Sequence, residues 1–279
     1  MLITLSKWPQ RRRPNTTGSR TAPQPFVSDV QWKMIEDLFD DPEPSVSGGR
    51  PRVSARQCLE GVLWVLKTGA RWKDLPERYP SFTTCWRRHK QWTESGTLVS
   101  AWSRLIDELD RRKLLNWSQA LGDGTFSPAK KRGPEVGKTK KGKGTKLMVL
   151  TEGRGLPVSA FTISAQVAEV NTIETLIDIQ VAGKRPERLL YDKAADADWL
   201  RDALERRGIA QITPHREGRK KPAKTDGRTL RRYKHRWKIE RTISWLGYQR
   251  RLLVRHEYYV HLFEGFLHLA CLMLCLKWF

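Results

Sequence analysis

Two strongly basic stretches constrain the fold of this chain most, because neither can be buried in an apolar core. Residues 129–146 hold eight Lys or Arg and one Glu, and residues 216–238 hold eleven Lys or Arg and two acids. Their net charges of +7 and +9 supply 16 of the +22 carried by the 279 residues. Charge this concentrated opposes compaction unless a polyanion shares the surface. We therefore expect two basic loops, 129–146 and 215–232, and a nucleic-acid partner.

The remaining sequence has enough apolar material for a folded core. Hydrophobic residues make up 39% of the chain and there are 12 Trp, which excludes a disordered protein. The length suits one large domain or two smaller ones. An anionic membrane is the alternative polyanion, but the apolar run 266–276 is too short to span a bilayer. We expect that run to be a buried helix and the protein not to bind a membrane.

The cysteines do not predict a metal site. Cys58, Cys85, Cys271 and Cys275 lack the paired CxxC spacing of zinc sites, and Cys85 with His89 offers only two ligands. Reduced thiols in a cytoplasmic protein explain them most simply. A bacterial, nucleoid-associated location is the matching expectation.

The first 116 residues predict a basic arm followed by a small helical domain. Residues 1–25 surround the Arg11–Arg13 cluster and form the arm, and residues 26–116 form the domain. Capping-box pairs Ser28/Gln31 and Ser54/Gln57 predict the starts of two helices. A third helix is expected to begin at residue 81 or 83, and a fourth at about residue 97.

The third of these helices has the composition of a DNA-reading helix. It is basic and aromatic and follows a short turn, so we expect a helix-turn-helix-like DNA contact through Arg87, Arg88 and Lys90. Two of its aromatic residues, Trp86 and Trp92, are expected in the hydrophobic core and not against bases.

From residue 118 the pattern changes to strands, and residues 117–279 predict an α/β domain. The expected order is a strand near 118–126, a hairpin over 146–164, a helix near 170–181, and a strand at 187–192. A helix near 199–207, a strand at 211–214 and a helix over 233–246 follow. The last helix would run for about four turns, with Ile239, Ile243 and Leu246 on its apolar face.

Three acids stand at informative places in this order. Asp123 and Asp192 stand where two predicted strands end, and Glu240 lies on the basic helix. Carboxylate oxygens are the ligands that Mg²⁺ prefers, and two such ions can promote phosphodiester cleavage. Each acid also has a structural explanation, because Asp-Gly is a common turn and Asp192 could cap a helix, as could Asp196 or Asp198. Glu240 could simply pair with Arg236 one turn earlier.

At these residues the chain resembles a known family, the DDE transposases of bacterial insertion sequences. Tyr233, Arg236 and Glu240 fit the family's Y-x2-R-x3-E signature, and ERTISWLGYQRRLLVR is similar to its usual continuation. The first family motif matches at DGT, residues 123–125, with GKTKKGKGTK after it. GRPR at 49–52 and TGARWKDLPERYPSFTTCWRRHKQW at 68–92 match the family's helical leader. The resemblance extends from about residue 28 to the end.

The resemblance implies a ribonuclease H-like catalytic core, a mixed sheet flanked by helices, behind the helical DNA-binding domain. It implies that Asp123, Asp192 and Glu240 bind two Mg²⁺ or Mn²⁺ ions. It also implies cleavage at the element's terminal inverted repeats, transfer of the freed 3′-hydroxyl to target DNA, and an assembly of at least two copies. It further implies that Tyr233 and Arg236 contact DNA or orient Glu240. Other DNA contacts are expected from Arg241, Lys140, Lys141, Lys143 and Lys146.

Three positions depart from the family pattern. Gly247 stands where a Lys is common, so that role would pass to Arg250 or Arg251 or be absent. Ala195 stands where an aromatic residue often follows the second acid, and Leu147 and Met148 stand where a His is often found. None of these changes removes an acid. Two alternatives stay open: a decayed or domesticated copy that binds DNA without chemistry, and a structure-selective nuclease on the same core.

Overall fold

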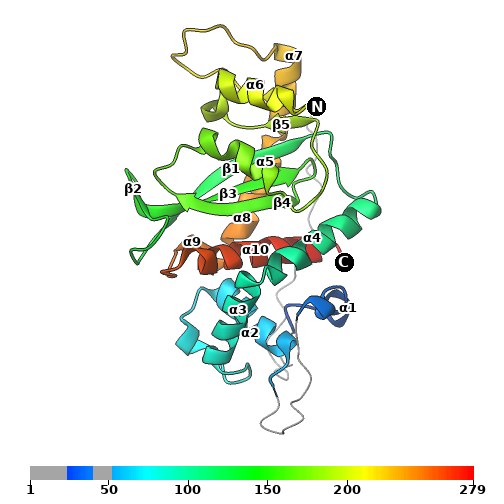
Figure 1. Cartoon of the computed structure of the whole chain (residues 1–279), viewed down its shortest axis with the longest axis vertical. Helices are drawn as coiled ribbons and strands as arrows, with labels where there is room; N and C mark the ends of the chain where they lie inside the picture. Colours follow the sequence, from blue (N-terminus) through cyan, green and yellow to red (C-terminus); the bar gives the residue numbers. More distant parts are fainter. Residues whose placement is uncertain (1–23, 40–51) are drawn as a thin grey trace, which may run out of the picture.

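The computed structural model describes residues 24–39 and 52–279 (Figure 1). The basic arm predicted for residues 1–25 lies outside the described residues except for its last two positions. The turn between the first two helices also falls outside them, together with most of the GRPR motif at 49–52.

The amino-terminal part is helical, as predicted. Its elements are α1 (Asp29–Lys33), the 3-10 turns η1 (Glu36–Leu38) and η2 (Trp72–Asp74), α2 (Ala55–Thr68), α3 (Phe82–Glu94) and α4 (Thr97–Arg111). The capping box of Ser28 and Gln31 is present. The predicted capping box of Ser54 and Gln57 is wrong, because the Ser54 side chain makes no capping hydrogen bond to α2.

The two tryptophans of α3 have different environments. Trp92 is 1% exposed and packs edge-on against Phe39, with 5.0 Å between ring centroids, as expected of a core residue. Trp86 is 36% exposed, so its predicted core position is wrong. The difference follows from helix geometry, because two residues six positions apart lie about 120° apart around the helix axis.

The carboxy-terminal part is built on one mixed sheet. Its strands are β1 (Ala120–Pro128), β2 (Gly137–Thr139), β3 (Gly142–Glu152), β4 (Pro157–Ser164), β5 (Arg188–Leu190) and β6 (Ala210–Ile212). β3 pairs antiparallel with both β1 and β4, and β5 and β6 continue the sheet parallel to β1. The resulting order β4-β3-β1-β5-β6 is the arrangement expected of a ribonuclease H-like core, which confirms the predicted fold class.

The first basic stretch, predicted as a loop over residues 129–146, is irregular only as far as residue 136. β2 and β3 form an antiparallel hairpin in which Gly137 faces Gly144 (Figure 1). The glycines of this hairpin allow close packing, because a Cβ on Gly144 would lie 2.4 Å from the Phe126 ring. The Thr145 hydroxyl further ties β3 to the Glu135 carbonyl at 2.7 Å.

Helices cover both sides of the sheet (Figure 1). They are η3 (Glu169–Thr172), α5 (Ile173–Asp178), η4 (Lys193–Ala195), α6 (Asp198–Arg206), α7 (Gly227–Leu230), η5 (Arg231–Arg236), α8 (Trp237–Gly247), α9 (Arg250–Leu253) and α10 (Val260–Leu276). The second basic loop, predicted over 215–232, therefore ends in the short helix α7. The single helix predicted over 233–246 is also wrong, because its first turn is the 3-10 segment η5 and α8 begins only at Trp237.

α10 joins the two parts of the chain. It lies against α3 and α4 on one side and β4 on the other, and its buried residues belong to one hydrophobic core that runs from α1 to the sheet. The buried carboxy-terminal helix is thus confirmed and begins earlier than predicted. None of the helices described has both the length and the apolar character to cross a bilayer.

One buried histidine at this junction predicts acid sensitivity. His89 stacks on Phe266 at 4.2 Å, bonds the Leu262 carbonyl through Nε2 at 3.0 Å, and has no partner at Nδ1. Burial lowers the pKa of His89 to about 4. In the unfolded chain His89 takes up its proton near pH 6.5. The contribution of neutral His89 to the unfolding free energy is therefore complete above that pH and is lost as the pH falls towards 4. We expect a loss of about 3 kcal/mol in unfolding free energy across this window.

His89→Phe should remove this part of the pH dependence while keeping the ring stack. Chemical denaturation at several pH values between 4 and 7 measures it. A variant that keeps the wild-type slope would assign the acid sensitivity to other groups.

Candidate active site

Asp123 lies within β1, five residues before its end, where it faces Val149 of β3. The expectation that the strand ends at this acid is therefore wrong, and so is the alternative of a turn residue. An extended strand holds the Asp123 side chain more firmly than a turn would, because pairing with β3 fixes its backbone.

The glycines on either side of Asp123 allow other side chains to reach the backbone beneath it. A Cβ on Gly122 would lie 2.5 Å from the Tyr191 ring, and a Cβ on Gly124 would lie 3.0 Å from the Glu169 carboxyl carbon. Alternation along a strand puts these neighbours on the sheet face opposite to the Asp123 side chain. The GDG sequence is thus needed for close packing behind the carboxylate.

Gly122→Ala tests this packing. The new methyl group would displace the buried Tyr191 ring, so we expect a loss of about 1–3 kcal/mol in unfolding free energy. The matched control is Gly183→Ala, because nothing lies within 4 Å of the Cβ position there. Thermal or chemical unfolding of the two variants measures the difference. Equal stability of the two would show that the Tyr191 ring moves aside without cost.

Asp192 is brought to the same place by the parallel pairing of β5 with β1. It directly follows Tyr191 at the end of β5, and its Oδ1 accepts a hydrogen bond from the Ala194 amide at 2.9 Å. The capping role that we considered for Asp192 is therefore real. Its other oxygen, Oδ2, faces Arg236 at 4.0 Å.

Arg236 lies among all three predicted acids. Its Nη2 donates to Asp123 Oδ2 at 2.6 Å, its Nη1 is 4.0 Å from Asp192 Oδ2, and its Nε is 3.6 Å from Glu240 Oε1. Nη1 also donates to the Tyr233 hydroxyl at 3.2 Å. Tertiary folding thus collects Asp123, Asp192 and Glu240 around one guanidinium, although 69 and 48 positions separate them in the sequence.

The charges of this cluster are unevenly solvated. The Asp123 side chain is 16% exposed, whereas that of Glu240 is 61% exposed. Burial raises the pKa of Asp123 above its usual value, and Arg236 together with the Gly124 amide offsets only part of that effect. Burial alone would lower the pKa of Arg236, but the Asp123 charge and the Tyr233 contact outweigh it and the pKa rises.

The donor chemistry of the cluster fits a hard divalent cation, because all three candidate ligands are carboxylates. In the described part of the chain, however, no three Asp, Glu, His or Cys residues already lie close enough together to hold a metal. Arg236 accounts for this arrangement, since its guanidinium occupies the side of Asp123 that faces the other two acids. A metal held by these residues would have to replace that contact.

Sequence reasoning missed a fourth acid, Glu169. Its carboxylate lies behind Gly124 and is 3.4 Å from Lys146 Nζ. Burial raises the pKa of Glu169, Lys146 opposes that shift, and the nearby charge of Asp123 adds to it. No local pattern singles out Glu169, because it lies just outside a predicted helix and far from the other acids in the sequence. Lys146, which we expected to contact DNA, pairs with Glu169 and donates a hydrogen bond to the Val167 carbonyl at 2.9 Å.

Asp196 and Asp198, the alternatives to Asp192, anchor the second basic stretch. Asp196 is buried and pairs with Arg201 and Arg219, and Asp198 pairs with Arg219, Lys221 and Lys224. Hydrogen bonds from Arg219, Lys221 and Lys224 lower the pKa of Asp198. These two acids therefore fix a loop and do not face Arg236.

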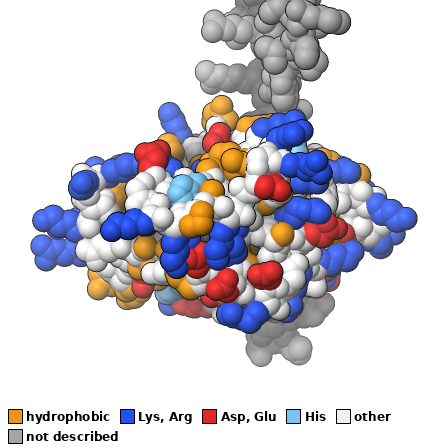
Figure 2. Space-filling view, turned by 90° about the horizontal axis from the view of Figure 1, so that it is seen from above, with side chains coloured by type: hydrophobic (Ala, Val, Ile, Leu, Met, Phe, Trp, Pro, Cys, Tyr) orange, Lys and Arg blue, Asp and Glu red, His pale blue; other side chains and the backbone are white. Residues whose placement is uncertain are grey.

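Some of the other predicted DNA-contacting residues are exposed, and some are buried or held by contacts within the protein. Lys140, Lys141 and Lys143 are exposed at the tip of the β2–β3 hairpin, and Arg87 and Lys90 are exposed on α3. Arg88 is 8% exposed, and Arg241 donates to the Arg154 carbonyl at 2.8 Å while stacking on Trp237 and Trp245. Figure 2 shows Lys and Arg side chains spread over the face at the top of Figure 1, with acids among them.

The residues proposed to substitute for a Lys at 247 do not reach the acids. Arg251 is buried against Glu257 and the Ala70 carbonyl, and Arg250 packs beside Gly69. Both lie on α9, beyond the end of α8, so neither supplies a cation to the cluster. The transfer of that role to Arg250 or Arg251 is therefore wrong, and the alternative that the role is absent remains.

Residues 120–276 match the family model described as "Transposase DDE domain". This chain belongs to the DDE transposases. The matched segment contains every strand of the sheet and all three acids of the cluster. Residues 27–102 of this transposase also match the model "Putative transposase of IS4/5 family", which covers the helical part from α1 into α4.

Two insertion-sequence proteins of Burkholderia cepacia are similar to this transposase. The "Insertion element IS402 uncharacterized 16.2 kDa protein" is 36% identical over 120 residues, which are 42% of this chain and 82% of that protein. The "Putative transposase for insertion sequence element IS402" is 31% identical over 140 residues, 47% of this chain and 63% of that protein. The latter match thus spans less than two thirds of the relative.

Among solved structures, one similar chain is from the piggyBac transposase synaptic complex with hairpin DNA. The TM-score is 0.48 at 10% sequence identity, over 87% of this chain and 70% of that chain.

Proposed function

We propose that this transposase binds the terminal inverted repeats of its own insertion sequence, cleaves the DNA at those ends, and joins the freed 3′-hydroxyl to target DNA. The observation that carries the proposal is the convergence of Asp123, Asp192 and Glu240 on Arg236, within the segment that matches the DDE domain. Two copies or more would hold the two ends together.

Asp123, Asp192 and Glu240 would hold two Mg²⁺ or Mn²⁺ ions. When bound, such ions activate the attacking oxygen and stabilise the leaving oxygen of a phosphodiester. Metal binding would free Arg236 from Asp123, and its guanidinium could then pair with a DNA phosphate while Tyr233 holds its orientation. Glu240, the most exposed of the three acids, is the one that can adjust its side chain most easily.

The basic surface would position the DNA around this cluster. The lysines at the β2–β3 hairpin tip, Lys140, Lys141 and Lys143, offer phosphate contacts without sequence preference. Arg87 and Lys90 on α3 would bring the helical part onto the inverted repeat.

An end-cleavage assay tests the proposal. Purified protein is mixed with labelled DNA that carries the inverted repeats flanking its own gene, with Mg²⁺, with Mn²⁺, or with a chelator. We expect strand cleavage at the repeat ends only with a metal, and joined products when target DNA is added. Normal end binding without metal-dependent cleavage would contradict the proposal, and so would cleavage of branched DNA that ignores the repeats.

A further inference from the structure

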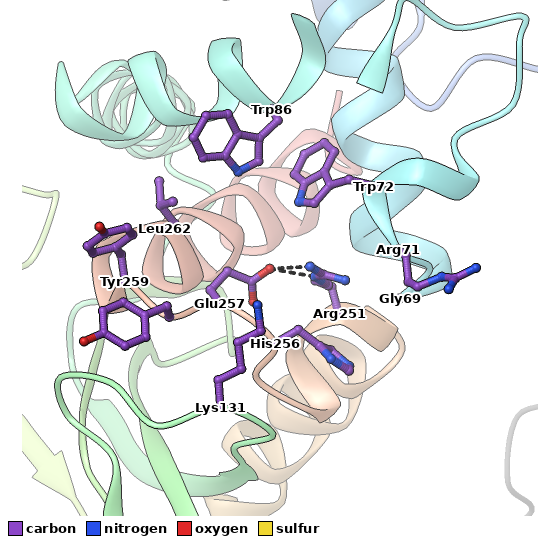
Figure 3. Close-up of a pocket in the computed structure, with 11 residues that line it drawn as sticks. Gly69, Arg71, Trp72, Trp86, Lys131, Arg251, His256, Glu257, Tyr259 and Leu262 are labelled. Carbon is purple, nitrogen blue, oxygen red and sulfur yellow. Dashed lines mark hydrogen bonds and ion pairs between the residues drawn. The ribbon is translucent and has the colours of Figure 1, made fainter. Parts of the chain in front are cut away.

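A cavity of about 430 Å³ lies between the amino-terminal helices and the carboxy-terminal part that contains the sheet. Asp123, Asp192 and Glu240 do not line it. Trp72 of η2 and Trp86 of α3 lie on one side of it, and Lys131, between β1 and β2, lies on the other (Figure 3). The segment between α9 and α10 supplies Glu257 and Tyr259. β1 continues for five residues beyond Asp123, roughly 17 Å of strand, before the chain reaches Lys131, so the cavity lies past the end of β1 and away from the acids.

The walls of this cavity expose aromatic faces. Trp86 is 36% exposed, Tyr258 is 52% exposed and Tyr259 is 55% exposed. Aromatic side chains of this size are normally covered by a core or a partner. A planar ligand with two apolar faces, such as a nucleobase, gains stacking energy on such walls.

Glu257 lines the cavity and carries one unused acceptor. Its side chain is 7% exposed, and its Oε1 accepts from Nε of Arg251 at 2.8 Å and also from Nη2. The second oxygen, Oε2, is buried and has no hydrogen-bond partner among the described residues. Arg251 also donates to the Ala70 carbonyl at 3.0 Å, which fixes the pair in place. An unpaired buried acceptor is costly, so this oxygen is suited to receive an N–H from a ligand.

Two cations lie at the opening. Arg71 and Lys131 are exposed and line the same cavity. They could pair with the phosphates on either side of a base that enters it.

We propose that this cavity binds an unpaired nucleobase bearing an exocyclic amino group, within a DNA strand that runs between the two parts of the protein. The base would stack on Trp86 and donate its amino hydrogen to Glu257 Oε2. Cytosine fits this chemistry and thymine does not, because thymine carries a carbonyl at the corresponding position. A base in a duplex is excluded, since its faces are stacked and its amino group is paired. This site lies outside the proposed cleavage chemistry.

Fluorescence anisotropy with short oligo(dC) and oligo(dT) tests the site, without metal and with the full chain. We expect wild type to bind oligo(dC) more tightly than oligo(dT). Trp86→Ala should weaken oligo(dC) binding about 5- to 100-fold, the range for loss of one stacked base, and leave duplex binding unchanged. The control is Trp199→Ala, because Trp199 is 48% exposed on α6 and outside the cavity.

Glu257→Gln tests the hydrogen bond separately from stacking. Arg251 can only donate, so the Gln oxygen must face it and the amide nitrogen must face the cavity. The preference should therefore change from oligo(dC) to oligo(dT), because thymine offers an acceptor. Melting temperatures confirm that each variant is folded.

Three results would overturn this proposal. They are unchanged oligo(dC) binding by Trp86→Ala, an equal loss with Trp199→Ala, and a cytosine preference that survives Glu257→Gln. Competition by free dCMP as strong as by oligo(dC) would also overturn it, since the ligand would then be a mononucleotide. Metal-dependent end cleavage is measured independently, so failure here leaves the proposed function untouched.

Discussion

Replacing Glu240 by Ala should lower end cleavage by about 10²–10³-fold or more, while binding to the inverted repeats is retained. The scale is that of losing one group that stabilises transition-state charge. Binding should survive because a carboxylate does not attract phosphates, and among the described residues the Glu240 carboxylate pairs only with Arg236, at 3.6 Å. Asp123→Ala and Asp192→Ala should have the same effect on cleavage.

The control for these variants is Asp202→Ala, which removes an exposed acid from α6. Cleavage and gel-shift assays on the same labelled DNA separate chemistry from binding. Wild-type cleavage by Glu240→Ala would remove this residue from the catalytic set. Full activity of Asp192→Ala would instead restrict Asp192 to its capping of η4.

Replacing Arg236 by Gln should make the protein more dependent on metal for its stability. The guanidinium is 17% exposed and neutralises Asp123 at 2.6 Å, with Asp192 and Glu240 close by. Without it three carboxylates face one another, and we expect a loss of about 2 kcal/mol in unfolding free energy without metal. Mg²⁺ should recover much of that loss, because it no longer competes with Arg236 for Asp123.

Thermal unfolding with and without Mg²⁺ measures this effect without any DNA. The rise in melting temperature on adding Mg²⁺ should be larger for Arg236→Gln than for wild type. The rise for Arg236→Lys should fall between those of Arg236→Gln and wild type, since Lys keeps the charge but not the planar group that reaches three acids. Arg206→Gln, an exposed change on α6, is the control. An identical Mg²⁺ response in Arg236→Gln and wild type would show that the guanidinium does not compete with the metal.

Much of the fold was predictable because its signals are local. The change from helical to strand periodicity near residue 118 placed the catalytic domain, and the β3–β4 hairpin, β5 and α10 formed where apolar patterning predicted them. Ser28 and Ser81 cap their helices, as their positions before apolar runs indicated.

The errors share one physical cause, which is that tertiary contacts outweighed local preference. Glycines near residues 137–144 suggested a loop, yet they allow close pairing of β2 with β3 and packing under Phe126. Asp-Gly at residue 123 suggested a turn, yet both glycines make room for Tyr191 and Glu169 behind a strand. Trp86 looked like a core residue, but the helix turns it towards the cavity.

The sequence by itself determined the family and the fold class and singled out the three candidate acids, because residue type and spacing carry that information within short motifs. Only the tertiary structure decided which groups meet. It placed Arg236 among acids from β1, β5 and α8, added Glu169 behind Asp123, and removed Arg251 from the site by pairing it with Glu257. Contacts between residues dozens of positions apart depend on how the strands pair and pack, and no local pattern contains that information.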